Sequence, residues 1–183
     1  MNPSQSASSP PRHFALIPAA GVGARMGGQI PKQYMPLAGL PMLLHALQTF
    51  ADHPRIAHTF VVVSAEDGWI DSLMTQDLLQ RVSILRAGGP TRQDSVFNGL
   101  NAIRDQVADA DRVLVHDAAR PGLDAALLDR LLDTLADDQV GGLLAVPVVD
   151  TLKRGDGGAP ARSQETVPRA GLWAAQTPQM FPY

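Results

Sequence analysis

The chain has 183 residues, of which 45% are hydrophobic and 18% are charged, and its formal net charge is −3. This length predicts one globular domain, which can bury about 70% of its unfolded surface without further cross-links. The absence of cysteine excludes a disulfide framework, a thiolate zinc site, an iron–sulfur cluster and a cysteine nucleophile. The slightly acidic balance, with only five Phe, two Trp and two Tyr residues, argues against a nucleic-acid-binding module.

No segment approaches the ~18 uninterrupted apolar residues that a membrane span needs, so the sequence predicts a soluble protein without a membrane partner. Residues 1–12, MNPSQSASSPPR, are polar and rich in Ser and Pro. They predict a disordered tail and not a signal peptide, and the cytoplasm is therefore the expected location. The remainder, 13–183, is expected to form a single domain.

Apolar runs alternate with runs of helical period between residues 14 and 149. We predict strands at Phe14–Ile17, Thr59–Val63, Val82–Leu85, Val113–His116 and Leu143–Val148, and helices at Pro41–Ala51, Trp69–Met74, Ser95–Arg104 and Asp124–Leu135. This alternation predicts an α/β fold with a mostly parallel twisted sheet and helices on both faces. Ligands bind such sheets outside the carboxyl ends of the strands.

Residues 151–171 break the alternation. They are polar, contain three glycines and two prolines before Gly171, and show no core periodicity. Such a segment is either a long loop or an excursion such as a hairpin arm, and long loops inside compact domains are usually functional or disordered.

The loop after the first strand, PAAGVGARMGG, is followed by PKQY. Its small residues let the backbone approach a ligand closely, and successive N–H groups can bind an anion. Arg25 and Lys32 add positive charge. The dinucleotide fingerprint fails because Met26 stands where Gly or Ala is needed, and the P-loop fails because Gln29 and Ile30 replace Lys and Ser/Thr. A tight strand-to-helix connection remains the purely structural alternative.

Five motifs in the chain carry a family resemblance. The stretch PAAGVGARMGGQIPKQY resembles the nucleotide-binding signature of sugar-phosphate nucleotidyltransferases, and its PKQY end is similar to that of the 2-C-methyl-D-erythritol 4-phosphate cytidylyltransferases. The later segments GGPTRQDSV, VHDAARP, PVVDTLK and LWAAQTPQMF resemble that family's second nucleotide loop, its metal and substrate loop, the start of its dimerisation arm and the return from that arm. The same order over residues 14–183 makes the resemblance specific.

The resemblance implies a Rossmann-like nucleotidyltransferase fold with a protruding dimerisation arm at residues 148–171. It implies transfer of CMP from CTP to 2-C-methyl-D-erythritol 4-phosphate, which yields 4-diphosphocytidyl-2-C-methyl-D-erythritol and pyrophosphate in the non-mevalonate isoprenoid pathway. Mg²⁺ would be the cofactor, and a homodimer would share its active sites. The alternatives are a cytidylyltransferase for another polyol phosphate, such as ribitol 5-phosphate, and a nucleotide-binding module without turnover.

The same resemblance implies roles for individual residues. Arg25 and Lys32 would be catalytic, and Asp117 would bind the metal. Nucleotide and substrate contacts would come from Pro18, Ala19, Ala20, Gly21, Gly23, Gly89, Ser95, Asp117, Ala118, Arg120, Thr151 and Arg169.

Structural alternatives accompany several of these roles. Asp117 also fits a turn or N-cap, and Asp94 or Ser95 also fits an N-cap. Strand alternation turns His116 away from Asp117, which favours a structural role. Thr151 and Arg169 also fit a flexible loop with incidental side chains. Family members continue beyond Tyr183 with a further helix, expected to begin near Phe181, and a region that carries another acceptor-binding lysine, so we expect this sequence to lack that end.

Overall fold

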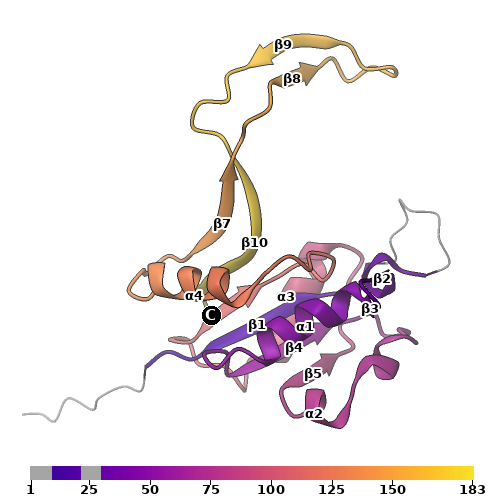
Figure 1. Ribbon diagram of the computed structural model, residues 1–183, viewed down its shortest axis with the longest axis vertical. Coiled ribbons are helices and arrows are strands. Elements are labelled where there is room, and N and C mark those ends of the chain that lie inside the picture. Colours follow the sequence, from indigo (N-terminus) through magenta and orange to yellow (C-terminus); the bar gives the residue numbers. More distant parts are fainter. Residues whose placement is uncertain (1–9, 22–29) are drawn as a thin grey trace, which may run out of the picture.

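The computed structural model describes residues 10–21 and 30–183, and Figure 1 shows a twisted sheet from which a long hairpin projects. The six-stranded sheet has the order β5-β4-β1-β6-β10-β7. Its strands are β1 (His13–Pro18), β4 (His58–Val62), β5 (Val82–Leu85), β6 (Arg112–Val115), β7 (Gly142–Pro147) and β10 (Trp173–Pro182). The pairs among β5, β4, β1 and β6 are parallel, whereas β10 runs antiparallel to β6 and β7. The predicted α/β fold with a mostly parallel sheet is therefore confirmed.

Helices cover both faces of this sheet. On one face, α1 (Met42–Ala51) and α4 (Ala125–Thr134) bury Phe50 and Leu128 against Ile17. On the other face, α3 (Arg92–Ala102) packs over Leu16 and Val62. Alternate residues of β1 therefore enter opposite cores, as expected for a strand buried on both sides. No helix in the described part of the chain is long and apolar enough to cross a membrane.

Several element boundaries differ from the sequence predictions. The predicted helix Trp69–Met74 is a 3-10 turn at Ile70–Leu73, followed by the four-residue helix α2 (Gln76–Leu79). The strands β2 (Pro36–Leu37) and β3 (Leu40–Pro41) form a small hairpin between the PKQY motif and the predicted helix, whose first residue belongs to β3. The strand β10 has no counterpart among the predicted strands, because its polar residues interrupt any continuous apolar run.

The described chain is anchored before the first strand. Arg12 lies at the end of the predicted tail, and its guanidinium forms an ion pair with Asp111 at 2.6 Å and lies 4.9 Å from the ring centre of Phe14. The backbone N–H of Arg12 also donates to Asp111 at 2.8 Å. Residues 1–9 of the predicted tail lie outside the described residues. Residue 12 therefore makes ordered contacts with the body of the protein.

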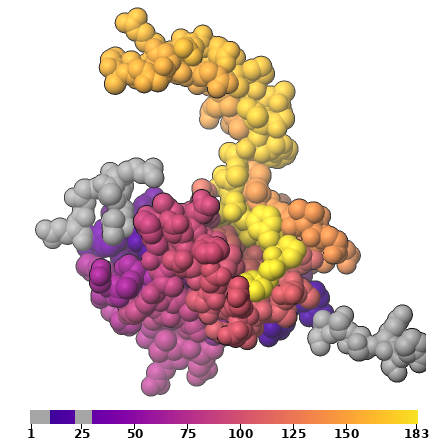
Figure 2. All heavy atoms as spheres, turned by 180° about the vertical axis from the view of Figure 1, so that it is seen from behind, coloured from indigo at the N-terminus to yellow at the C-terminus, as the bar shows by residue number. Residues whose placement is uncertain are grey.

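The segment between β7 and β10 forms an antiparallel hairpin of β8 (Leu152–Gly155) and β9 (Ser163–Val167). β7 and β10 lead out of the sheet as its stalk, and the hairpin stands clear of the body in two opposite views (Figure 1, Figure 2). Large apolar side chains at its base are open to solvent, with Val149 73% and Trp173 62% exposed. We call residues 148–171 the arm.

Candidate active site

Two glycine-containing loops meet at the carboxyl edge of the sheet. The N–H of Ala19 donates to the carbonyl of Val62 at 2.7 Å, and the N–H of Gly88 donates to the carbonyl of Val63 at 2.8 Å. A Cβ at position 88 would lie 2.3 Å from the Cβ of Ala20, so glycine is needed for the loops to touch. Among the predicted contacts, Pro18 ends β1, and Ala19, Ala20, Gly21 and Gly89 belong to these adjoining loops.

The first of these loops ends in a 3-10 turn at Lys32–Tyr34. Lys32 is exposed, whereas the next residue, Gln33, is buried. The side-chain amide of Gln33 donates to the carbonyls of Ala19 and Gly21 at 2.7 and 3.0 Å. Arg25 and Gly23, which were also predicted to serve the site, lie outside the described residues.

Thr91 caps helix α3 and thereby shapes the second loop. The hydroxyl of Thr91 accepts from the N–H of Asp94 at 3.1 Å, and the carboxylate of Asp94 accepts from the N–H of Thr91 at 3.1 Å. This reciprocal capping box makes Thr91 the N-cap, so the alternative in which Asp94 or Ser95 is the N-cap does not hold. The buried hydroxyl of Ser95 instead accepts from the N–H of Gly89 at 3.0 Å and donates to the carbonyl of Thr91 at 3.0 Å. Ser95 thus holds the second loop in place.

The loop after β6 places Asp117 between two arginines. The Nε of Arg92 lies 2.6 Å from one carboxylate oxygen of Asp117, and the Nε of Arg120 lies 3.0 Å from the other. The guanidinium of Arg120 also donates to the side-chain oxygen of Gln176. Two guanidinium groups around one carboxylate give this cluster of three side chains a net positive charge, which suits an anionic ligand. Asp117 also begins a turn, since its carbonyl accepts from the N–H of Arg120 at 3.0 Å.

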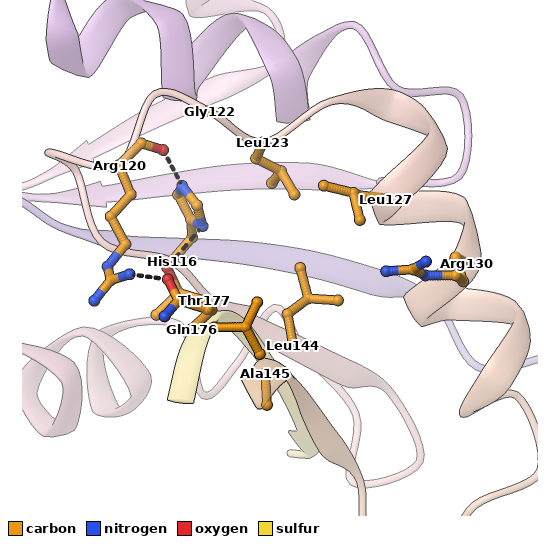
Figure 3. Close-up of a pocket in the computed structure, with 11 residues that line it drawn as sticks. His116, Arg120, Gly122, Leu123, Leu127, Arg130, Leu144, Ala145, Gln176 and Thr177 are labelled. Atoms are coloured by element: carbon orange, nitrogen blue, oxygen red, sulfur yellow. Dashed lines mark hydrogen bonds between the residues drawn. The ribbon is translucent and has the colours of Figure 1, made fainter. Parts of the chain in front are cut away.

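His116 and Thr177 secure this loop from beneath, and Figure 3 shows the two side chains facing each other. The Nε2 of His116 lies 3.0 Å from the carbonyl of Arg120, which only accepts, so Nε2 carries the proton. Thr177 then donates to Nδ1 at 3.0 Å and accepts from the N–H of Asp117 at 3.3 Å. Burial lowers the pKa of His116, which keeps the ring neutral near pH 7. This arrangement agrees with the structural role predicted for His116.

A cavity of about 350 Å³ adjoins the same loop on the side of α4 (Figure 3). Leucine side chains from α4 and β7 form its apolar wall, while Arg120, Arg130 and Gln176 supply polar groups. The buried Ala118 follows Asp117 directly in the loop beside it. Sequence reasoning did not single out Arg92, Gln33, Thr177 or Gln176, although each lies within a motif that carried the family resemblance.

The arm carries the last two predicted contacts away from this edge. Thr151 is exposed immediately before β8, and Arg169 is exposed after β9, where its guanidinium donates to the carbonyl of Val149. Because the arm projects from the body, one chain does not bring Thr151 or Arg169 to Asp117 (Figure 1). Within a single chain, the predicted site is therefore divided between the sheet edge and the arm.

The donor set at the edge fits a magnesium ion only together with a ligand. Among the described residues, no group of three or more His, Cys, Asp or Glu side chains is arranged to hold a metal. Mg²⁺ commonly uses one or two carboxylates together with substrate phosphates. Asp117 is partly exposed, and its two oxygens offer more acceptor positions than Arg92 and Arg120 occupy. Asp117 thus fits one protein ligand of such an ion.

A family model, curated sequences and solved structures that resemble this chain all point to one family. Residues 13–183 match the sequence model of a family described as IspD, 2-C-methyl-D-erythritol 4-phosphate cytidylyltransferase. An enzyme of that name from Thiobacillus denitrificans is 55% identical over 172 residues, which cover 93% of this chain and 74% of the relative. The crystal structure of the Francisella tularensis enzyme of that name superposes with a TM-score of 0.76 at 34% identity, covering 93% of this chain and 72% of that one. A crystal structure of 4-diphosphocytidyl-2C-methyl-D-erythritol synthase gives a TM-score of 0.80 at 40% identity, over 94% and 75% of the two chains.

Proposed function

Because the chain belongs to the 2-C-methyl-D-erythritol 4-phosphate cytidylyltransferase family, we propose that it transfers CMP from CTP to 2-C-methyl-D-erythritol 4-phosphate. The observation that carries this proposal is the meeting of three loops at one sheet edge. The first two touch through Ala20 and Gly88, and the pair of Arg92 with Asp117 joins the second to the third. The site thus offers backbone donors and cations to a triphosphate in one place.

In the proposed reaction, a phosphate oxygen of the acceptor forms a bond to the α-phosphorus of CTP. The bond from that phosphorus to the oxygen bridging to the β-phosphate breaks, and pyrophosphate leaves with the electron pair. Such a transfer depends chiefly on in-line positioning and on stabilising the charge of the phosphoryl oxygens. We assign the triphosphate to the first two loops, with Lys32 and Arg25 stabilising the transition state and the leaving group, and the acceptor phosphate to Arg120.

We further propose that Asp117 holds Mg²⁺ together with phosphate oxygens of the nucleotide. The ion would neutralise phosphate charge and so favour attack at phosphorus. In this arrangement Arg92 and Arg120 orient the carboxylate of Asp117, because each arginine contacts a different oxygen.

The arm is proposed to complete the acceptor site of a second copy in a homodimer. Its polar hairpin makes its side-chain bonds within itself, and apolar Val149 and Trp173 are exposed where it leaves the body. Exchange with a symmetric copy would cover this apolar surface and bring Thr151 and Arg169 to the partner's sheet edge.

A pyrophosphate-release assay tests these proposals with each nucleoside triphosphate, with and without Mg²⁺. We expect turnover with CTP, Mg²⁺ and 2-C-methyl-D-erythritol 4-phosphate, and much slower turnover when ribitol 5-phosphate replaces that acceptor. Faster turnover with ribitol 5-phosphate would contradict the proposed acceptor. Binding of CTP without release of pyrophosphate on adding acceptor would identify a nucleotide-binding module instead.

A further inference from the structure

We propose that Gln33 is a positioning residue that sets the direction of the peptide groups at residues 19–21 and thereby the binding of the triphosphate by this part of the first loop. This inference rests on the proposed function. Gln33 is only 6% exposed, and its side-chain nitrogen reaches the carbonyls of Ala19 and Gly21, which precede it by 14 and 12 residues. The side chain therefore closes the described ends of this loop onto each other.

The two contacts fix the sides to which the peptide groups point. An amide nitrogen carries two hydrogens, and Gln33 has one for each of the two carbonyls. In a trans peptide the C=O and N–H bonds point in opposite directions, so the N–H of Ala20 points away from Gln33 when the carbonyl of Ala19 points toward it. An anion-binding loop needs its N–H groups, and not its carbonyl oxygens, toward the phosphates. Gln33 draws two carbonyl oxygens to the protein side and so favours that arrangement.

The turn that carries Gln33 is itself firmly held. The hydroxyl of Tyr34 donates to the carboxylate of Asp67 at 2.8 Å, and its ring stacks on Trp69 with centroids 5.9 Å apart. Lys32 occupies the same turn and is exposed. Gln33 thus links the backbone at residues 19–21 to the turn that presents the proposed catalytic lysine.

The substitution Gln33→Glu tests this role with little change of shape. It replaces the NH2 group, with its two N–H donors, by one carboxylate oxygen that faces the two carbonyl oxygens. At pH 8 we expect kcat/KM for CTP to fall about 100-fold, the scale of effect that a displaced catalytic group produces. The introduced carboxyl is buried among acceptors, which raises its pKa. On lowering the pH toward 6 it gains a proton and one donor, so the ratio of variant to wild-type kcat/KM should rise.

The matched control is Gln80→Glu, at an exposed glutamine after α2. This control should keep the wild-type kcat/KM and show no pH-dependent change in its ratio to wild type. The positioning role would be overturned if the ratio of Gln33→Glu to wild-type kcat/KM stayed near one at pH 8. It would also be overturned if kcat/KM fell by the same factor at every pH. If Gln33→Glu does not fold, Gln33→Ala removes the donors without adding an acceptor, and it should raise KM for CTP about tenfold. An unchanged KM for CTP in a folded Gln33→Ala protein would also overturn the role.

Titration calorimetry with CTP separates this inference from the proposed function. Weaker CTP binding by Gln33→Glu at pH 8, with recovery toward pH 6, supports the role of Gln33 even if the wild-type protein shows no turnover. Equal CTP affinity of wild type and Gln33→Glu at pH 8 rejects the role even if wild-type turnover is normal.

Discussion

The loops at the sheet edge and the arm are held in opposite ways. Asp117 begins a loop whose two ends are fixed by a buried His116 and Thr177, and its carboxylate contacts arginines from two different segments. The arm has exposed cross-strand pairs, such as Arg154 with Glu165 at 2.6 Å, and no core beneath them. Loops anchored in a core can position reacting groups by themselves, whereas an arm of this kind needs another surface to define its position.

The largest expected effect belongs to the sheet edge. Lys32→Ala should lower kcat by about 1,000-fold, because it removes a cation proposed to stabilise the charge of the transition state. The exposed side chain contributes little to folding, so the thermal midpoint should stay close to the wild-type value. Pyrophosphate release and calorimetric unfolding measure the two quantities. A near-normal kcat would remove Lys32 from the mechanism and weaken the contrast between edge and arm.

A heterodimer experiment tests whether the arm serves the partner's edge. Arg169→Ala should lower kcat/KM for the acceptor about 100-fold, because a cation next to the acceptor phosphate is lost. A heterodimer of Lys32→Ala with Arg169→Ala, purified with two affinity tags, would contain one site with both residues intact. It should recover about half of the wild-type activity, because the two sites of a twofold dimer are equivalent. Activity no higher than that of the two parent variants would show that each arm serves its own chain or none.

The hydrogen bonds of Thr177 to His116 and Asp117 should have an intermediate effect on stability and turnover. Thr177→Val removes the hydroxyl that bonds His116 and the N–H of Asp117, leaving a buried ring nitrogen and a partly buried N–H without that partner. We expect a loss of about 1–3 kcal/mol in the free energy of unfolding and a kcat/KM about tenfold lower. Thr177→Ser keeps the hydroxyl and should stay near wild type in urea unfolding and in turnover. Equal losses in both variants would assign the effect to the methyl group and not to the hydrogen bonds.

The sequence predicts strands that are buried on both faces better than strands that contain polar residues. Strands such as Thr59–Val63 are evident because burial on both faces requires a continuous apolar run, and β4 (His58–Val62) confirms that prediction. β10 escapes prediction because Gln176, Thr177 and Pro178 interrupt its apolar pattern, although two of these three residues are buried.

For the candidate site, the sequence predicts where single residues lie along the chain but not which distant segments come into contact. The sequence places Asp117 at a strand end, but it does not reveal the contact with Arg92, 25 residues earlier, because topology and not local spacing brings them together. Thr91 escapes detection as the N-cap because Asp94 and Ser95 are equally common capping residues. The arm that carries Thr151 and Arg169 has no core periodicity that would distinguish its hairpin from a loop.

The smallest expected effect comes from the exposed pair within the arm. Arg154→Ala breaks the pair with Glu165, whose two side chains are 61% and 57% exposed in the single chain. Solvent screens such pairs, so the free energy of unfolding should change by less than about 1 kcal/mol in urea titration. If the arm packs on a second copy, however, the variant should raise the dimer dissociation constant in analytical ultracentrifugation. The corresponding change in the free energy of dissociation should exceed the change in the free energy of unfolding of the monomer. Unchanged association together with a loss above about 1 kcal/mol in the free energy of unfolding would show that the hairpin is stabilised within its own chain and does not need a second copy.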